Sequence, residues 1–213
     1  SSKRASLKNE EKPMPTTHET PVETPARPRT VVRERIVEIV SDSGEGAQKA
    51  GQTFGTVCAK LGTGVWTVEI IPAEIQPPAR SVAGASGNRV RLGSGRITNG
   101  GDEADLVIAF NEQVLLGRVH INELKPGCTI LLENMWRDHR DPRIATSYAE
   151  TYAALEAAGY RILEVPMERE CLKVVKDARR GKNMFALGML CAIYQLDLAL
   201  ARDQVARTFR KKS

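Results

Sequence analysis

Apolar residues recur along the chain with two periods, one typical of strands and one of helices. Residues 35–40 form a short β-branched run that predicts a strand, and a glycine-containing segment, 41–46, follows it. Apolar residues then recur at helical spacing at Ala47, Ala50, Phe54, Val57 and Leu61, and Gly62 and Gly64 predict the end of that helix. Residues 65–71 predict the next strand. Residues 35–71 therefore predict a βαβ unit, expected to be right-handed and parallel.

Later apolar runs predict strands at 88–92, 105–110, 129–133 and 161–165, with helices between the last three. Residues 147–150 have capping-box spacing, and Gly159 predicts the end of the helix that they would start. This alternation predicts an α/β protein: a three-layer α/β/α Rossmann-like domain with a mostly parallel mixed sheet.

Two helices are expected near the end of the chain. Residues 184–196 are apolar all round, so a helix there should be covered on most sides. Asp197 can cap a final helix that continues through Phe209.

The first 29 residues differ in composition from the rest. They hold five prolines among Thr, Glu and Lys, with almost no large apolar side chain, so they cannot bury a core. We expect residues 1–29 to be a flexible N-terminal arm and residues 30–213 to be one domain. The total of 213 residues, 41% of them hydrophobic, suits a single core.

The distribution of charge changes what the net charge of +5 implies. Basic residues outnumber acidic ones at both ends of the chain, and residues 31–206 carry a net charge of only −1. A nearly neutral body offers no basic face to a nucleic acid. The longest apolar run, 184–196, is shorter than the roughly 20 residues needed to span a bilayer. We therefore expect neither a nucleic-acid nor a membrane partner.

The residues able to bind metals or act in catalysis are scattered. The four cysteines, at 58, 128, 171 and 191, form no C-x-x-C pair and are expected to be reduced core thiols in a cytoplasmic protein. The three histidines, at 18, 120 and 139, stand in different segments. We expect no metal ligand and no catalytic set in this chain.

The loop 41–46 lies where an α/β protein binds phosphate, between the first strand and the N-terminus of the first helix. Asp42 and Glu45 place carboxylates there, and the G-x-G-x-x-G pattern is absent. The alternative is a self-capped helix start, in which Ser43 caps the amides and Glu45 neutralises the helix dipole. From the loop alone, we favour this second interpretation.

The irregular segment that follows residues 68–75 is a second candidate site, because long loops after such strands often bind ligands. Glu74 could be a positioned acid and Arg80 an anion clamp, with Arg89 nearby. The alternative is a surface loop with solvated charges.

The order of five motifs resembles the gamma domain of 2-oxoacid:ferredoxin oxidoreductases. The motifs span residues 43–46 with Gly51, 72–75, 105–111, 125–127, and 182–184 with 187–188. The resemblance covers residues 34–209. It is greatest to the N-terminal part of the alpha subunit in the 2-oxoglutarate:ferredoxin oxidoreductase (2-oxoglutarate synthase) type. Ser41 and residues 76–78 depart from the family pattern, which has glycine at the first position and Arg-Gly-Gly at the others.

The resemblance implies a complex that converts a 2-oxoacid, expected to be 2-oxoglutarate, and CoA to an acyl-CoA, carbon dioxide and reduced ferredoxin, reversibly. Thiamine diphosphate, Mg²⁺ and iron–sulfur clusters are expected on partner subunits, and none on this chain, which alone should not be catalytic. The implied CoA-side candidates are Ser43, Gly44, Glu45, Gly46, Glu74 and Arg80. Because the chain stops where fused relatives continue, we expect an excised or separately encoded domain.

Two other functions are compatible with the sequence. One is a stand-alone nucleotide-binding Rossmann-like dehydrogenase or sensor, indicated by the βαβ start and its glycine loop. The other is a purely structural adaptor.

Overall fold

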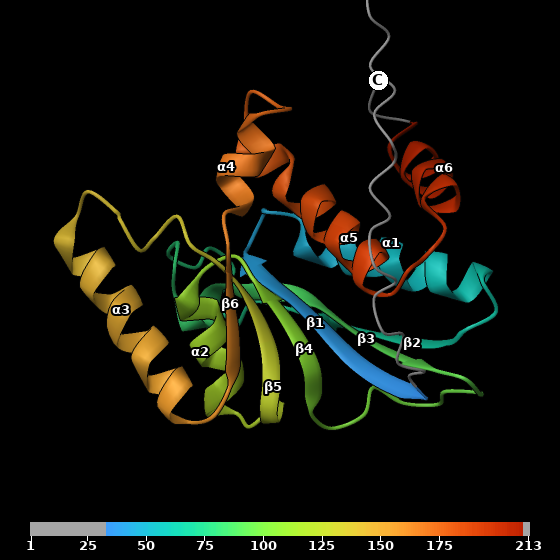
Figure 1. Cartoon of the computed structure of the whole chain (residues 1–213), viewed down its shortest axis with the longest axis horizontal. Coiled ribbons are helices and arrows are strands. Elements are labelled where there is room, and N and C mark those ends of the chain that lie inside the picture. The colour runs from blue at the N-terminus through green and yellow to red at the C-terminus, as the bar shows by residue number, and fades with distance from the viewer. Residues whose placement is uncertain (1–32, 211–213) are drawn as a thin grey trace, which may run out of the picture. The chain divides into compact units, whose positions relative to one another are not determined.

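The computed structural model describes residues 33–210, apart from the side chain of Arg180. Its centre is a six-stranded sheet in the order β2-β3-β1-β4-β5-β6 (Figure 1). The strands are β1 (Glu34–Asp42), β2 (Gly64–Ile70), β3 (Ala85–Gly93), β4 (Ala104–Ala109), β5 (Leu124–Glu133) and β6 (Arg161–Val165). β1, β4, β5 and β6 are parallel, which confirms the mostly parallel mixed sheet. The arm predicted for residues 1–29 lies outside the described residues.

The predicted βαβ unit is wrong in one respect. β1 and β2 run in the same direction, because each is antiparallel to β3, but they are not neighbours. β3 lies between them and pairs with β1 from Glu34↔Gly93 to Asp42↔Ala85. Sequence periodicity detects each strand and carries no information on which strands pair.

Helices cover both faces of the sheet (Figure 1). On one face lie α1 (Ala47–Lys60), α5 (Lys182–Ile193) and α6 (Leu198–Phe209). On the other lie α2 (Glu112–His120) and α3 (Pro142–Ala157), while the short α4 (Met167–Leu172) follows β6. The three layers confirm the predicted fold class. None of the helices in the described range has the length and apolarity required to cross a bilayer.

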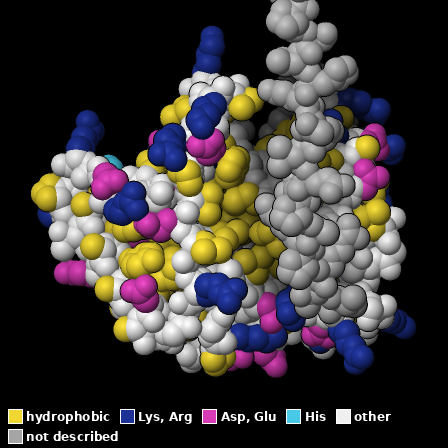
Figure 2. Space-filling model, in the orientation of Figure 1, with side chains coloured by type: hydrophobic (Ala, Val, Ile, Leu, Met, Phe, Trp, Pro, Cys, Tyr) yellow, Lys and Arg dark blue, Asp and Glu magenta, His cyan; other side chains and the backbone are white. Residues whose placement is uncertain are grey.

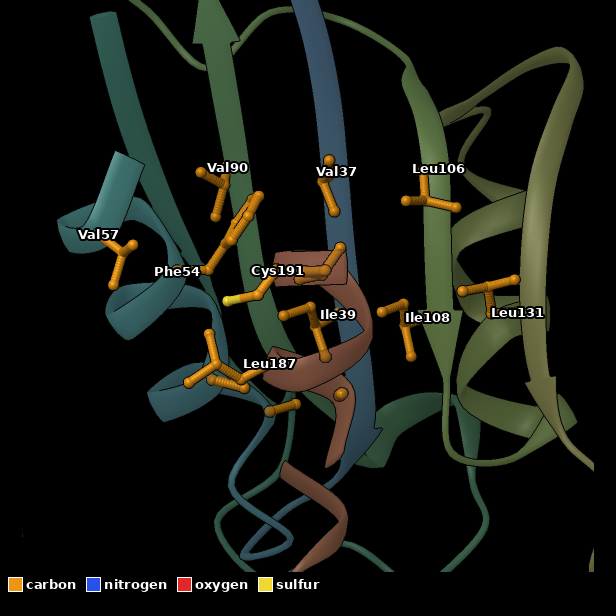
Figure 3. Close-up of a cluster of buried hydrophobic side chains, with 14 of the residues drawn as sticks. Val37, Ile39, Phe54, Val57, Val90, Leu106, Ile108, Leu131, Leu187 and Cys191 are labelled. Atoms are coloured by element: carbon orange, nitrogen blue, oxygen red, sulfur yellow. The ribbon is translucent and has the colours of Figure 1, made fainter. Parts of the chain in front are cut away.

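The core on the α1–α5 face follows from the alternation of side chains along the strands. Val37 and Ile39 of β1 point to this face and are completely buried. Phe54 of α1 and Leu187 of α5 pack over them, as Figure 3 shows. All four cysteines are unpaired and buried, as predicted for core thiols. Burial raises the pKa of the Cys58 and Cys128 thiols to about 12.

The helix termini confirm some predictions and correct others. Asp197 caps α6 by accepting hydrogen bonds from two backbone amides, and Gly159 has the left-handed φ of 86° that ends α3. The capping box at residues 147–150 is wrong, because α3 starts earlier, with Asp141 as its N-cap and Pro142 at its first position. Gly64 is the first residue of β2 and does not end α1.

Each face of the sheet is covered by helices over only part of its width. α1 packs on β1, β2 and β3, so the same face of β6 stays open, and Leu163 is 50% exposed there. Figure 2 shows hydrophobic side chains gathered over this part of the sheet. On the opposite face, Trp66 of β2 is 44% exposed. α5 is also less covered than predicted, since Ile193 is 48% exposed.

Candidate functional site

The carboxyl ends of β1 and β4 form the switch point of the sheet. The two strands are parallel neighbours. The chain leaves β1 for α1 on one face and leaves β4 for α2 on the other. Open α/β sheets commonly bind ligands outside the strand ends where the connections diverge in this way. The loop 43–46 and Asn111 lie at this edge.

The loop 43–46, here called the glycine turn, is shaped by two left-handed glycines. Gly44 has φ 89° and Gly46 has φ 87°. Gly46 is the N-cap of α1, and no side chain caps the helix. The prediction that Ser43 caps α1 is therefore wrong: Ser43 is an exposed turn residue. An N-terminus without a side-chain cap keeps its amides and its positive dipole available for an anion.

A buried ion pair holds the glycine turn. Lys182, the first residue of α5, is 2% exposed, and its Nζ lies 2.8 Å from Glu45 Oε1. The same ammonium lies 5.2 Å from the centre of the Phe110 ring. Next to Lys182, Asn183 packs against Gly46 so closely that an added Cβ would lie 2.6 Å from its Nδ2. Glu45 thus fixes the turn to α5, a role beyond the predicted neutralisation of the dipole.

Glu133 adds a second buried carboxylate at the same edge. It ends β5, is completely buried, and accepts hydrogen bonds from the amides of Met135 (3.1 Å) and Glu168 (2.8 Å). Burial raises its pKa, while these two amides and the charge of Lys182 oppose the increase. Lys182 therefore acts electrostatically on both Glu45 and Glu133.

Arg80 reaches this edge of the sheet from the loop that follows β2. Its amide donates to both carboxylate oxygens of Asp42, at 2.9 Å each. Its guanidinium pairs with Glu112 of α2 and lies 4.2 Å from the centre of the Trp136 ring. Trp136 is held in turn, since its Nε1 donates to the carbonyl of Phe110 at 2.9 Å. Arg80 is thus not a solvated loop charge, because its guanidinium is paired with Glu112.

Several polar atoms at this edge have no hydrogen-bond partner among the described residues. They are Arg80 Nη1, Glu112 Oε2 and Asn111 Nδ2, all buried. The oxygen of Asn111 is used, because it caps α2 by accepting from Gln113 and Val114 at 3.0 Å. Buried polar groups are normally paired, so this edge keeps unused hydrogen-bonding capacity.

The structure brings together most, but not all, of the predicted site residues. Glu45 and Gly46 meet Lys182 and Asn183, and Asp42 connects the glycine turn to Arg80. Glu74 is exposed and makes no hydrogen bond or ion pair to the described residues. Arg89, grouped with Arg80 in the sequence, lies on β3, where its Nε donates to Glu38 at 2.8 Å.

Lys182, Glu112 and Trp136 were not predicted as site residues. The sequence does contain a signal for Lys182. A lysine at the start of an apolar helix is expected to be buried and then needs a charged or polar partner. Glu112 had a weaker signal, as an acid two residues after the strand at 105–110. Trp136 had none, because its contact with Arg80 depends on the order of strands in the sheet.

The family model for pyruvate ferredoxin/flavodoxin oxidoreductase matches residues 37–213. The 2-oxoglutarate oxidoreductase subunit KorA of Mycobacterium tuberculosis is 28% identical over 187 residues. That alignment covers 83% of this chain but only 28% of the relative, so the chain spans less than a third of that protein.

Solved structures share the fold. The 2-oxoglutarate:ferredoxin oxidoreductase of Magnetococcus marinus, solved with 2-oxoglutarate, coenzyme A and succinyl-CoA, matches with a TM-score of 0.63 at 24% identity, over 86% of this chain and 28% of that one. The gamma subunit of a keto/oxoacid ferredoxin oxidoreductase of Geobacter sulfurreducens matches with a TM-score of 0.59 at 15% identity. There the match covers 83% of this chain and 85% of the subunit.

Proposed function

Because the chain belongs to the pyruvate ferredoxin/flavodoxin oxidoreductase family, we propose that it is the gamma domain or subunit of a 2-oxoacid:ferredoxin oxidoreductase. The assembled complex would convert 2-oxoglutarate, CoA and oxidised ferredoxin to succinyl-CoA, carbon dioxide and reduced ferredoxin, reversibly. The names of two similar proteins support 2-oxoglutarate as the 2-oxoacid.

The domain would shape the CoA side of the thiamine site, and one observation carries this proposal. At the switch point between β1 and β4, α1 starts without a side-chain cap on a turn that Lys182 fixes from α5. Fixed backbone amides at a helix N-terminus are suited to the phosphates of CoA. Ser43, Gly44, Glu45 and Gly46 would line this side, and the exposed Glu74 would contact CoA or a neighbouring subunit.

The partners would supply the redox and carbon chemistry. Thiamine diphosphate would activate the 2-oxoacid, and iron–sulfur clusters on other subunits would pass its electrons to ferredoxin. In the part of the chain that the structure describes, no group of three or more His, Cys, Asp or Glu residues could hold a metal ion. The role of this chain would be to orient CoA and complete the wall of the site.

Kinetics of the assembled complex test the proposal. Lys182→Met frees the glycine turn, because Glu45 loses its buried partner. We expect the KM for CoA to rise about 10-fold, with kcat changed less than about 2-fold, since the pair positions a binding group and no reacting atom. The measurement is 2-oxoglutarate- and CoA-dependent reduction of ferredoxin by the complex with variant or wild-type chain.

Lys173→Met is the matched control, because Lys173 also pairs with a glutamate, Glu170 at 2.6 Å, but is 63% exposed. It should leave the KM for CoA unchanged. An unchanged KM for both variants would leave only a structural adaptor role. Activity of the remaining subunits that does not respond to the chain would refute the proposal entirely.

One observation favours the alternative function, a stand-alone nucleotide-binding protein. The carboxylates of Asp42 and Glu45, which would repel a dinucleotide pyrophosphate, are occupied by the Arg80 amide and by Lys182. Calorimetric titration of the isolated chain with NAD, NADP and CoA separates the two functions. Binding of NAD or NADP more tightly than CoA would favour a dehydrogenase or sensor.

A further inference from the structure

Residues 71–81, here called the strap, join β2 to the short turn before β3 and cross the carboxyl edge of the sheet. The outer part of the strap is open, with Ile71 72% exposed and Ile75 fully exposed. At its two ends the backbone is held, by Ala73 N to Ala83 O at 2.9 Å and by the Arg80 amide on Asp42. Arg80 is therefore the inner anchor of the strap.

The anchor is an incomplete ion pair. One guanidinium nitrogen of Arg80 contacts one oxygen of Glu112, while Arg80 Nη1 and Glu112 Oε2 have no partner among the described residues. Arginine and carboxylate commonly pair through two parallel hydrogen bonds, which would use both atoms. Arg80 also adopts a left-handed backbone with φ 53°, which is unfavourable for a residue with a Cβ. A purely structural anchor at such a buried position would be expected to satisfy these groups.

The backbone contact of Arg80 leaves its side chain able to adopt a second position. Its amide is bound to Asp42, the residue directly before the glycine turn. The side chain can therefore turn from Glu112 toward the glycine turn while the backbone contact persists. Glu112 is fully buried on α2 and presents to Arg80 the same kind of oxygen that an anionic ligand would present.

We propose that Glu112 is a positioning residue that holds Arg80 in the free protein and releases it to an anionic group bound at the glycine turn. Glu112 thereby competes internally with the ligand, and binding loosens the strap. This inference deepens the proposed CoA-side function and rests on it. The ligand class is a phosphate-bearing anion, because the acceptor at the uncapped start of α1 and at a guanidinium must be negatively charged.

Removing the competitor should strengthen anion binding. Glu112→Gln keeps the shape of the side chain and removes its charge. We expect the 213-residue variant to bind inorganic pyrophosphate at least about 5-fold more tightly than the wild type, a typical coupling between linked sites. Binding is followed by the fluorescence of Trp136, which Arg80 covers, in a Trp66→Phe background that leaves Trp136 as the single tryptophan.

Glu38→Gln is the matched control, because Glu38 is also fully buried and paired with arginines, Arg89 and Arg118, but on β1 away from the strap. It should leave pyrophosphate affinity at the wild-type value, and adding Arg80→Ala to Glu112→Gln should abolish the gain. If Glu112→Gln folds poorly, Glu112→Asp, which withdraws the carboxylate from Arg80, serves for the same comparison.

Equal or weaker pyrophosphate binding by both Glu112 variants overturns the inference, as does the absence of any binding. The KM for CoA of the Lys182→Met complex distinguishes these outcomes from failure of the proposed function. If the competitor idea alone is wrong, Lys182→Met still raises the KM for CoA in the assembled complex. If the proposed function is wrong, that KM does not change, whatever pyrophosphate does.

Discussion

At the scale of single residues, charged side chains are buried at the carboxyl edge of the sheet, and burial makes their pairing important for stability. Glu133 is fully buried at the end of β5, and burial is the largest effect on its pKa. Lys182, 2% exposed, acts on it and pairs with Glu45. Removing the charge of Lys182 leaves Glu45 without its buried partner, and breaking a buried pair usually costs about 3–5 kcal/mol.

Glu133 gives a pH dependence of known sign. Its pKa is raised above the ordinary value of 4.5, so the native state holds the proton more tightly than the unfolded state. Stability from this group is therefore present at low pH and is lost as pH rises from 4.5 through the native pKa. We expect Glu133→Gln, which stays neutral, to gain stability relative to wild type over that rise, as measured by urea unfolding at a series of pH values.

Glu170→Gln provides a control of opposite sign. The ion pair with Lys173 lowers the pKa of Glu170, so its contribution is present above the unfolded pKa and is lost as pH falls. The free energy of unfolding of Glu170→Gln should therefore fall relative to that of the wild type as pH rises. A constant difference between Glu133→Gln and wild type would contradict the assigned burial effect.

At the scale of elements, α1 lies close to β3 because Gly51 has no side chain. A Cβ at Gly51 would lie 2.4 Å from the Cβ of Asn88, a fully buried residue whose amide has no partner among the described residues. Gly51 belongs to the motif set from which the resemblance was inferred, and the structure gives it a packing role. The close approach positions the start of α1, and with it the glycine turn.

Gly51→Ala should consequently destabilise the protein by about 2–3 kcal/mol, in the range of overpacked cores. Gly188→Ala is the matched control, since Gly188 also lies within a helix but meets nothing within 4 Å. There alanine should be neutral or stabilising by up to about 1 kcal/mol, because it favours the helix. Melting temperatures of the two variants check both values, and equal effects would disprove the packing role.

The elements also show how far the sequence could predict the structure. Local periodicity and caps predict all six strands and the helices at 47–60 and 198–209, because these signals lie within the segment that forms each element. The insertion of β3 between β1 and β2 could not be predicted, because pairing is decided by contacts between distant segments. In the site, the glycine turn was predicted by its position, whereas the pairing of Arg80 with Glu112 depends on tertiary structure.

At the scale of the whole molecule, both faces of the sheet keep an open apolar part. Leu163 of β6 is exposed on one face and Trp66 of β2 on the other. Large exposed apolar patches on soluble proteins usually mark interaction sites. This distribution is compatible with the proposed function, in which other polypeptides complete the site.

A substitution on the open face of β6 should separate folding from assembly. We expect Leu163→Glu to change the stability of the isolated chain by less than about 1 kcal/mol, because the side chain is already half exposed. It should nevertheless weaken co-elution with the proposed thiamine- and cluster-bearing subunits in size-exclusion chromatography. Ile121→Glu, at a site 58% exposed after α2, is the control and should not affect co-elution. Normal assembly of the Leu163 variant would exclude this face as an interface.

The position of β3 has a consequence for biosynthesis. β1 ends at Asp42, yet both of its sheet neighbours, β3 and β4, begin only at Ala85 and Ala104. At about 5–20 residues per second, the ribosome needs several seconds to make the intervening chain. During that interval β1 has no partner strand from the sheet, and the nascent β1, α1 and β2 can pack only on one another or on a chaperone. A nascent chain that has emerged only as far as Ile70 would therefore carry no paired strand from this sheet, whereas the first three strands can join once Gly93 has left the ribosome.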